Sequence, residues 1–423
     1  MQPQSPSKVT RRRVFYFPGY DPFHPRRYRE LYRRESAEQA RVSGYEIALS
    51  HRPNATFFGW QVAARMDGID TITDVSVLVW SDIVRGSMRS SVSATYLQLL
   101  QTAWTYLSTG ALWRLMRLRK GPVIAALYPV CMLVGQLALA VVLALGVYAG
   151  TGRLLDGVMQ AVTVERPGDI GWSAKQLVAA ALGGAAGLWL MSWFKRQDGR
   201  FFAYYLMHDF AFSAGLRGAM PPELEQRLRA FGDAIADALS DDVEEVLVVG
   251  HSSGAHLAAV VLADLLREGR VSPQGPTLSF LSLGHVVPMV SFLPDAHRLR
   301  GALQYLSCQD AMFWVDVTAP GDGCAFALCD PVSVSGVAPE GKRWPLVFSA
   351  AFSQSLSPAR WKALRWRFFR LHFQYLCAFD APKDYDYFQI TAGPLTLGAR
   401  YANRAPSKSR IVWPVSKYTS VSA

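Results

Sequence analysis

Two long apolar runs constrain this chain more than any other feature of its sequence. Residues 121–150 and 176–194 contain no Asp, Glu, Lys or Arg. A helix of about 20 apolar residues is long enough to cross the hydrocarbon core of a bilayer. We therefore predict two transmembrane helices, over about 122–149 and 177–194; the alternative is a pair of buried core helices.

The charges that flank the two runs predict their orientation. Basic residues precede the first run and follow the second: Arg114, Arg117, Arg119 and Lys120, then Lys195, Arg196 and Arg200. The expected loop between them, residues 151–175, has as many acidic as basic residues. Because basic flanks remain in the cytoplasm, we expect a multi-pass protein of a bacterial inner membrane with both large flanking segments in the cytoplasm. No signal peptide is expected at the N-terminus.

A small-residue motif lies within the second run. Gly183 and Gly187 form a GxxxG pattern. Such a pattern lets two helices approach closely in a membrane, although small residues are common throughout this run. The motif therefore suggests where the two helices meet.

Composition excludes several classes of protein. Half of the residues are hydrophobic, which excludes a disordered chain, and the five cysteines form no CxxC motif. The net charge of +11 reflects basic clusters within 1–41 and 342–370. No nucleic-acid-binding motif accompanies them. We therefore expect membrane lipids rather than nucleic acid as partner, and no metal or organic cofactor.

The remaining sequence is typical of one α/β domain. We assign residues 1–110 and 201–400 to this domain, 111–200 to a membrane insertion, and 401–423 to a polar basic tail. Helices are predicted over 28–42 and 222–239. Strands are predicted over 13–17, 45–50, 56–64, 74–80, 245–249, 278–283 and 312–317. Alternating strands and helices predict a mostly parallel sheet with helices on both faces.

The most informative motif follows the strand predicted at 245–249. Gly250-His251-Ser252-Ser253-Gly254 contains G-x-S-x-G between this strand and a helix that extends to about Arg267. In a nucleophile elbow the serine occupies a sharp turn, and side chains two positions away would collide with the backbone. The motif therefore makes Ser252 a candidate nucleophile and Gly250 and Gly254 the elbow glycines. The alternative is a turn without catalytic function.

A serine nucleophile requires a histidine base and an acid that orients it. In strand-turn-helix hydrolases the order along the chain is Ser, acid, His. His285, His297 and His372 follow Ser252 beyond its own helix, and only His372 leaves room for an acid loop before it. His372 is therefore the predicted base, the alternative being a histidine buried for packing.

The predicted acid is Asp322. It lies in a Pro-Gly-Asp-Gly turn that follows the strand predicted at 312–317, where an acid loop is expected. Asp316 and Asp330 are the competing candidates. A carboxylate in such a turn can also serve only to form the turn.

An oxyanion hole requires two backbone N–H groups directed at the developing negative charge. One is expected from Ser253, the residue after the nucleophile. The other is expected from Tyr20, because Gly19 lets the loop after strand 13–17 approach the substrate. An ordinary Pro-Gly turn is the alternative.

On these motifs the chain resembles the α/β-hydrolase superfamily, on its lipase and esterase side. The resemblance covers about residues 13–90 and 205–390 and rests on the elbow, the triad order and the loop Pro18-Gly19-Tyr20. The chain departs from the family pattern by its membrane hairpin and by lacking an HGGG oxyanion loop. The resemblance implies an α/β-hydrolase fold that cleaves esters or related acyl bonds.

These observations together predict a membrane-anchored serine ester hydrolase that works through an acyl-enzyme. Ser252, Asp322 and His372 would form its triad. The membrane hairpin favours a lipid or other long-chain acyl ester as substrate. Two alternatives are a catalytically silent fold that serves as a membrane interaction protein, and an acyltransferase that uses the same triad.

Overall fold

The computed structural model describes residues 8–52, 56–88, 91–162 and 169–422. The chain divides into two compact units. The larger unit contains Met1–Ser87, Trp104–Ala125 and Phe212–Ala423, and the smaller contains Met88–Ala103 and Ala126–Ala211. The smaller unit is thus inserted in the sequence of the larger one.

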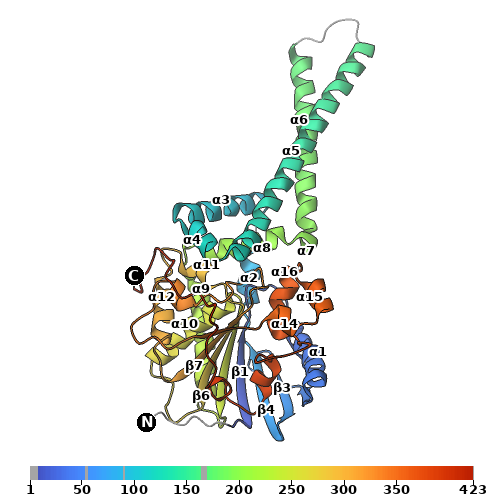
Figure 1. Ribbon diagram of the computed structural model, residues 1–423. Coiled ribbons are helices and arrows are strands. Elements are labelled where there is room, and N and C mark those ends of the chain that lie inside the picture. The colour runs from blue at the N-terminus through green and yellow to red at the C-terminus, as the bar shows by residue number, and fades with distance from the viewer. Residues whose placement is uncertain (1–7, 53–55, 89–90, 163–168, 423) are drawn as a thin grey trace. The chain divides into compact units, whose positions relative to one another are not determined.

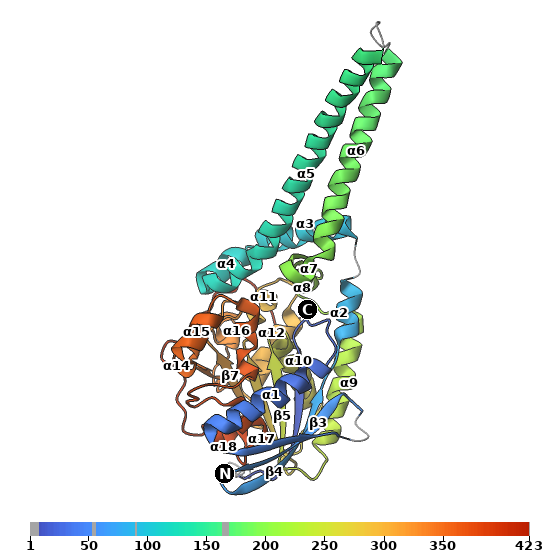
Figure 2. The ribbon, with the colours of Figure 1, turned by 90° about the vertical axis from the view of Figure 1, so that its right-hand side faces the viewer.

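An eight-stranded sheet forms the centre of the larger unit (Figures 1 and 2). Its strand order is β2-β3-β4-β1-β5-β6-β7-β8. The strands are β1 (Arg11–Phe17), β2 (Glu46–Ser50), β3 (Gly59–Met66), β4 (Ile69–Val77), β5 (Glu245–His251), β6 (Thr277–Leu283), β7 (Met312–Thr318) and β8 (Leu346–Ser349). Neighbouring strands are parallel except β2–β3 and β3–β4, which are antiparallel. The predicted α/β class with a mostly parallel sheet is confirmed.

Strand β1 joins the two halves of the sequence in one sheet. Val14 lies opposite Val75 of β4 on one side and opposite Leu247 of β5 on the other. β4 precedes the smaller unit in the chain and β5 follows it. The sheet therefore needs residues from both sides of the insertion.

Helices cover both faces of this sheet. Successive side chains of a strand point to opposite faces, so β1 directs apolar side chains to both faces and both need a cover. On one face Tyr16 of β1 packs against Tyr28 of α1, with ring centroids 5.0 Å apart. On the other face Phe17 packs edge-on against Phe231 of α9, at 5.7 Å. The helices of this unit are α1 (Arg26–Ser43), α2 (Ser81–Ser87), α4 (Ala111–Leu118), α9 (Pro222–Ala238), α10 (Gly254–Arg267), α11 (Val287–Ser291), α12 (His297–Leu306), α13 (Pro331–Val334), α14 (Phe352–Ser355), α15 (Pro358–Leu364), α16 (Phe368–His372), η1 (Phe373–Leu376), α17 (Tyr387–Ala392) and α18 (Leu397–Tyr401).

The predicted elements of this unit are present, with differences at strand ends. β4 spans Ile69–Val77 rather than 74–80; its first half, Ile-Asp-Thr-Ile-Thr, neither alternates regularly nor forms a continuous apolar run and so gives no clear strand signal. β8 was not predicted, since a four-residue strand after Pro345 gives little periodic signal. The turn expected between β2 and β3 includes residues 53–55, which lie outside the described residues.

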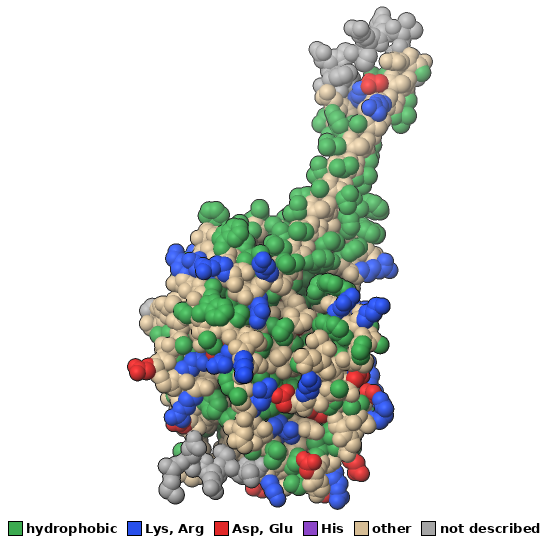
Figure 3. Space-filling view, in the orientation of Figure 1, with side chains coloured by type: hydrophobic (Ala, Val, Ile, Leu, Met, Phe, Trp, Pro, Cys, Tyr) green, Lys and Arg blue, Asp and Glu red, His purple; other side chains and the backbone are tan. Residues whose placement is uncertain are grey.

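The smaller unit is built around two long apolar helices. They are α5 (Lys120–Val162), whose first residues belong to the larger unit, and α6 (Asp169–Arg196). The smaller unit also contains α7 (Asp198–Phe201) and most of α3 (Val92–Ser108) and α8 (Ala203–Ala214), whose residues from Trp104 and from Phe212 onward belong to the larger unit. Over Lys120–Ala161 and Ala174–Arg196 the two long helices are apolar enough to cross a membrane, and their hydrophobic side chains are widely exposed (Figure 3).

The GxxxG glycines lie where the two long helices meet. A Cβ atom on Gly183 would lie 2.6 Å from the carbonyl oxygen of Ala144, and one on Gly187 would lie 3.2 Å from that of Ala140. A side chain at Gly183 would clash with the backbone of α5, and one at Gly187 would fit only if its neighbours shifted. The two glycines thus allow the backbones of α5 and α6 to approach closely.

Both long helices extend further than the sequence predicted. α5 continues through residues 151–162, which were expected to form a loop, and α6 begins at Asp169. Lys175 of α6 forms an ion pair with Asp156 of α5. These two charged residues, which were expected in the loop, thus lie in the two helices. Residues 163–168, including Glu165 and Arg166, lie outside the described residues.

Candidate active site

Ser252 occupies a sharp turn at the carboxyl end of strand β5. Its φ angle of +58° is left-handed, which is uncommon for a residue with a side chain. The turn is fixed by a 2.9 Å hydrogen bond from the N–H of Ser252 to the carbonyl of Leu283, the last residue of β6. A strained strand-to-helix turn of this kind presents the serine hydroxyl above the sheet.

The two glycines beside Ser252 lie too close to other backbone atoms to carry side chains. A Cβ on Gly250 would lie 2.6 Å from the Cα of Ala255. One on Gly254 would lie 2.1 Å from the carbonyl oxygen of Phe17, in β1. The turn therefore requires glycine at both positions.

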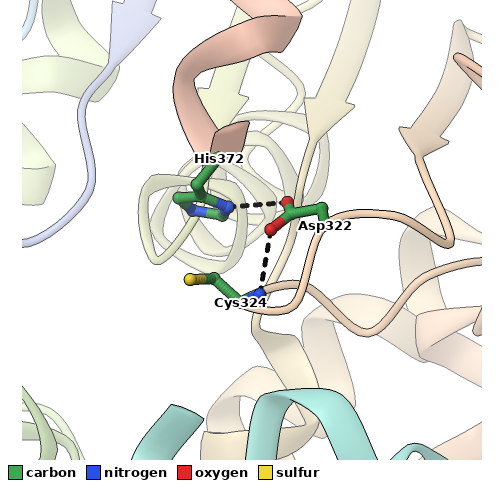
Figure 4. A group of neighbouring side chains, drawn as sticks. All are labelled: Asp322, Cys324 and His372. Carbon is green, nitrogen blue, oxygen red and sulfur yellow. Dashed lines mark hydrogen bonds and ion pairs between the residues drawn. The ribbon is translucent and has the colours of Figure 1, made fainter. Parts of the chain in front are cut away.

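His372 and Asp322 are hydrogen-bonded to each other (Figure 4). The distance from Nδ1 of His372 to Oδ2 of Asp322 is 2.7 Å, and both residues are buried. An ionised carboxylate only accepts hydrogen bonds, so Nδ1 carries the proton and Nε2 is left with its lone pair. Nε2 is the atom that a general base would use.

Two further groups hold Asp322. Its Oδ1 accepts a hydrogen bond from the N–H of Cys324, at 2.9 Å, and its Oδ2 accepts a second one from the hydroxyl of Tyr375, at 3.1 Å. Burial, with the nearby carboxylate of Asp322, raises the pKa of Tyr375 well above its ordinary value. Tyr375 therefore remains a donor at every working pH. The sequence did not identify Tyr375.

The competing carboxylates serve other purposes. Asp316 lies within β7 and accepts a 2.5 Å hydrogen bond from Ser282. Burial raises its pKa well above the ordinary value, which favours its protonated form. Asp330 accepts from two N–H groups at the start of α13 and forms a 2.6 Å ion pair with Lys342. Neither carboxylate contacts His372 within the described residues.

The competing histidines do not pair with Asp322. His285 is fully buried; its Nε2 donates to the carbonyl of Cys329 at 3.0 Å, and its Nδ1 accepts from the N–H of Val287 at 3.3 Å. Its Nε2 also lies 3.6 Å from Asp316. Both ring nitrogens are thus in use, and burial lowers its pKa to about 4. His297 begins α12 and has no recorded contact with the described residues of the candidate triad.

The imidazole of His372 lies beside the turn that carries Ser252. His251, the preceding residue, donates from Nε2 to the backbone carbonyl of His372 at 3.0 Å. A Cβ on Gly284 would lie 3.2 Å from Cε1 of His372. Gly284 comes directly after Leu283, whose carbonyl accepts the hydrogen bond from the N–H of Ser252. Among the described residues, no hydrogen bond joins the Ser252 hydroxyl to His372. Such bonds are often long in free enzymes and shorten when substrate binds.

His251 acts as a neutral donor in this arrangement. Burial, followed by the proximity of His372, lowers its pKa to about 3. It therefore carries no charge that would oppose an imidazolium at His372 at neutral pH. Its role in fixing the His372 backbone was not predicted.

The expected oxyanion donors both lie next to Ser252. A Cβ on Gly19 would lie 3.1 Å from the Cβ of Ser252, so the loop after β1 closely approaches the serine. The N–H of Tyr20 donates to the hydroxyl of Ser253 at 2.8 Å. The N–H of Ser253 donates to no acceptor in the described part of the chain. One predicted donor is therefore open and the other is occupied by a neighbouring hydroxyl.

Three residues of the site carry side-chain atoms of the kinds that bind metal ions. The ligand atoms of Asp322, Cys324 and His372 lie within 4.8 Å of one another (Figure 4). The direct bond between Asp322 and His372 leaves no space for an ion between Nδ1 and Oδ2. As placed, these two groups serve each other rather than a metal.

Comparisons with known proteins return no match: no family model, no curated protein and no solved structure matches this chain. The roles of the site residues are therefore inferred from their geometry and chemistry.

Proposed function

We propose that this protein is a membrane-anchored serine hydrolase that cleaves an acyl ester through an acyl-enzyme intermediate. One observation carries the proposal: the buried Asp322–His372 pair contacts His251, the residue before Ser252, and Ser252 occupies a left-handed turn. A nucleophile, a base and an acid that fixes the tautomer of the base are the three parts that such chemistry requires.

In the first half of the reaction the Ser252 hydroxyl attacks the acyl carbonyl while Nε2 of His372 takes its proton. The resulting oxyanion accepts hydrogen bonds from the N–H groups of Ser253 and Tyr20. Tyr20 must exchange the Ser253 hydroxyl for this oxygen. The alcohol then leaves with the proton from His372, and the acyl group stays on Ser252.

In the second half water replaces the alcohol. His372 takes a proton from water, the hydroxide equivalent attacks the acyl-enzyme, and the proton returns to Ser252 as the acid is released. Asp322 keeps its hydrogen bond to Nδ1 throughout and stabilises the imidazolium. Each N–H donor of an oxyanion hole is worth about 10²–10³ in rate.

The arrangement of strands supports an α/β-hydrolase fold. The serine follows a central parallel strand, the oxyanion loop follows the neighbouring strand β1, and the acid and the histidine come later in the chain. These are the positions that the strand-turn-helix mechanism uses. The insertion lies between β4 and β5, outside the catalytic loops.

The start of α5 supports a substrate in or near the bilayer. A Cβ on Gly121, in the first turn of α5, would lie 3.6 Å from the Cα of Gly323, the residue after Asp322. Arg119 donates to the carbonyl of Ala327 in the same loop, at 2.8 Å. The loop that holds the catalytic acid thus lies where the apolar helix begins. A lipid or other long-chain acyl ester fits this placement, with the catalytic unit in the cytoplasm.

A fluorophosphonate probe tests the chemistry. We expect the probe to label the purified full-length protein, Ser252→Ala to abolish labelling, and Ser272→Ala, which removes an exposed serine elsewhere, to leave it unchanged. Absence of labelling, or equal labelling of Ser252→Ala, would show a fold without hydrolase chemistry. Faster release of the acyl group by an added alcohol than by water would identify an acyltransferase.

A further inference from the structure

A short exposed segment leads directly into the catalytic histidine. All six residues from 365 to 370, Arg-Trp-Arg-Phe-Phe-Arg, are exposed. Trp366 is 72% exposed, Phe368 44% and Phe369 36%. Arg365, Trp366 and Arg367 link α15 to α16, and Phe368 begins α16; Figure 2 shows these two helices next to each other. Exposed apolar patches are typical of surfaces that bind a protein or a membrane.

The same segment has an uncompensated positive charge. Extended to residues 362–370, it contains Lys362, Arg365, Arg367 and Arg370, and no acidic residue occurs between Glu340 and Asp380. None of these four forms an ion pair with a described residue, whereas Arg360 pairs with Asp380. The arginines of β1 contrast with them: Arg11, Arg12 and Arg13 pair with Asp242, Glu245 and Asp241. The basic cluster near the N-terminus is therefore largely neutralised, but residues 362–370 are not.

Two contacts place this segment at the start of the first apolar helix. A Cβ on Gly323 would lie 3.0 Å from Cδ1 of Phe368, and Gly323 is also the residue that Gly121 approaches. A Cβ on Gly321 would lie 2.5 Å from the ring of Trp361. The segment thus packs on the same acid loop as the first turn of α5. Lys120 is the last charged residue before the apolar run, which begins at Gly121. On the proposed topology, the start of α5 and the segment beside it therefore lie at the lipid headgroups.

We infer that residues 362–370 form an interfacial segment that binds the anionic headgroup layer of the bilayer. The arginines and Lys362 would contact lipid phosphates, and Trp366 and Phe369 would enter the boundary with the acyl chains. Because the segment ends two residues before His372 and packs on the loop of Asp322, its binding positions the catalytic pair at the lipid surface. This inference rests on the proposed membrane anchoring but is independent of the proposed chemistry.

Hydrogen–deuterium exchange of the full-length protein in nanodiscs tests the inference. We compare discs of phosphatidylcholine alone with discs that also contain phosphatidylglycerol. Amides of 362–371 should exchange more slowly in the anionic discs, by at least about fivefold, the contribution of a single basic side chain near such a surface. Equal exchange in the two discs would overturn the inference, and this comparison requires no variant.

Two matched pairs of variants show whether the named residues are responsible. Arg365→Gln/Arg367→Gln/Arg370→Gln should lose the effect of phosphatidylglycerol, and Arg229→Gln/Lys408→Gln/Lys417→Gln, which removes the same charge from exposed positions elsewhere, should keep it. Trp366→Ala should speed exchange in both discs, and Trp413→Ala, at a 56% exposed site, should not. Loss of the lipid effect in the control variant would contradict the assignment to this segment.

Fluorophosphonate labelling in the same nanodiscs separates this inference from the proposed function. Labelling without a lipid effect on exchange would overturn the interfacial segment and leave the hydrolase intact. A lipid effect without labelling would overturn the hydrolase and leave the interfacial segment intact.

Discussion

Tyr375 and His372 donate to the same oxygen atom of Asp322. The hydroxyl of Tyr375 lies 3.1 Å from Oδ2 and Nδ1 of His372 lies 2.7 Å from it. The two donors are three residues apart in one segment, so they are positioned together. Tyr375 therefore fixes the carboxylate that in turn fixes the base.

Tyr375→Phe should lower kcat by roughly three- to tenfold with little change in KM, because it removes one hydrogen bond to a charged group in the site. Ester hydrolysis by the purified protein measures this effect. Tyr32→Phe is the matched control, since its buried hydroxyl bonds Thr391 away from the site, at 2.8 Å. An unchanged kcat in Tyr375→Phe would show that the tyrosine only fills space.

Replacing the two buried aspartates should separate the catalytic acid from its competitor. Asp322→Asn should lower kcat by about 10³–10⁴, because the base would lose its orienting carboxylate. Asp316→Asn should keep the activity. A comparable loss in Asp316→Asn would reassign the acid.

Asp316→Asn should also stabilise the protein at alkaline pH. Burial raises the folded-state pKa of Asp316 above that of the unfolded chain, so its contribution to stability is complete below the unfolded pKa and is lost as pH rises. Asparagine does not ionise and avoids this loss. Thermal unfolding should therefore show a gain in Tm for the variant that grows as the pH is raised from about 4, the pKa of aspartate in the unfolded chain.

The elbow glycine Gly254 should not tolerate alanine. Its Cβ would lie 2.1 Å from the carbonyl oxygen of Phe17, so β1 and the start of α10 would have to separate. We expect a loss of about 3 kcal/mol or more in the free energy of unfolding, as for other severe core clashes. Gly232→Ala in α9 is the control, because its Cβ would make only ordinary contacts at 3.7 Å and alanine favours a helix.

Acid should destabilise the larger unit through its buried histidines. Burial lowers the pKa of His251 to about 3 and those of His256 and His285 to about 4. The unfolded chain binds protons from about pH 6.5 downward, so the stability from these neutral histidines is present above that pH and lost as pH falls towards their folded values. Each contributes up to about 1.4 kcal/mol per pH unit.

The Tm should therefore fall between about pH 7 and about pH 5. His256→Leu should reduce the fall, because the Nδ1 atom of His256 has no hydrogen-bond partner in the described residues and its replacement removes a titrating group. An identical pH dependence in this variant would contradict the assignment.

The sequence predicted those features of the site that depend on local geometry or on chain order. The spacing of Gly250 and Gly254 around Ser252 and the order Ser252, Asp322, His372 can be read directly, although the clash that excludes a side chain at Gly254 is with β1. The parallel core was visible because β5 is a continuous apolar run. The long apolar helices were predicted, but not their ends, since helix can continue through polar residues such as those at 151–162.

Other features depend on packing between distant segments and left no pattern in the sequence. Tyr375 and His251 are ordinary residues until the chain brings them to Asp322 and to the His372 backbone. The hydrogen bond from Tyr20 to Ser253 joins residues 233 positions apart. The ion pairs between the arginines of β1 and the acidic residues at 241–245 also join segments that are distant in the sequence.

The position of β1 between β4 and β5 has a consequence for biogenesis. A ribosome completes both apolar helices at Arg196 before it reaches β5 at Glu245. The first four strands therefore leave the exit tunnel with one long side of β1 unpaired, and on the proposed topology the hairpin is inserted while that edge awaits its partner. On the proposed topology, insertion into the bilayer precedes closure of the sheet, so the turn of the candidate nucleophile Ser252 forms only on a chain that is already tethered.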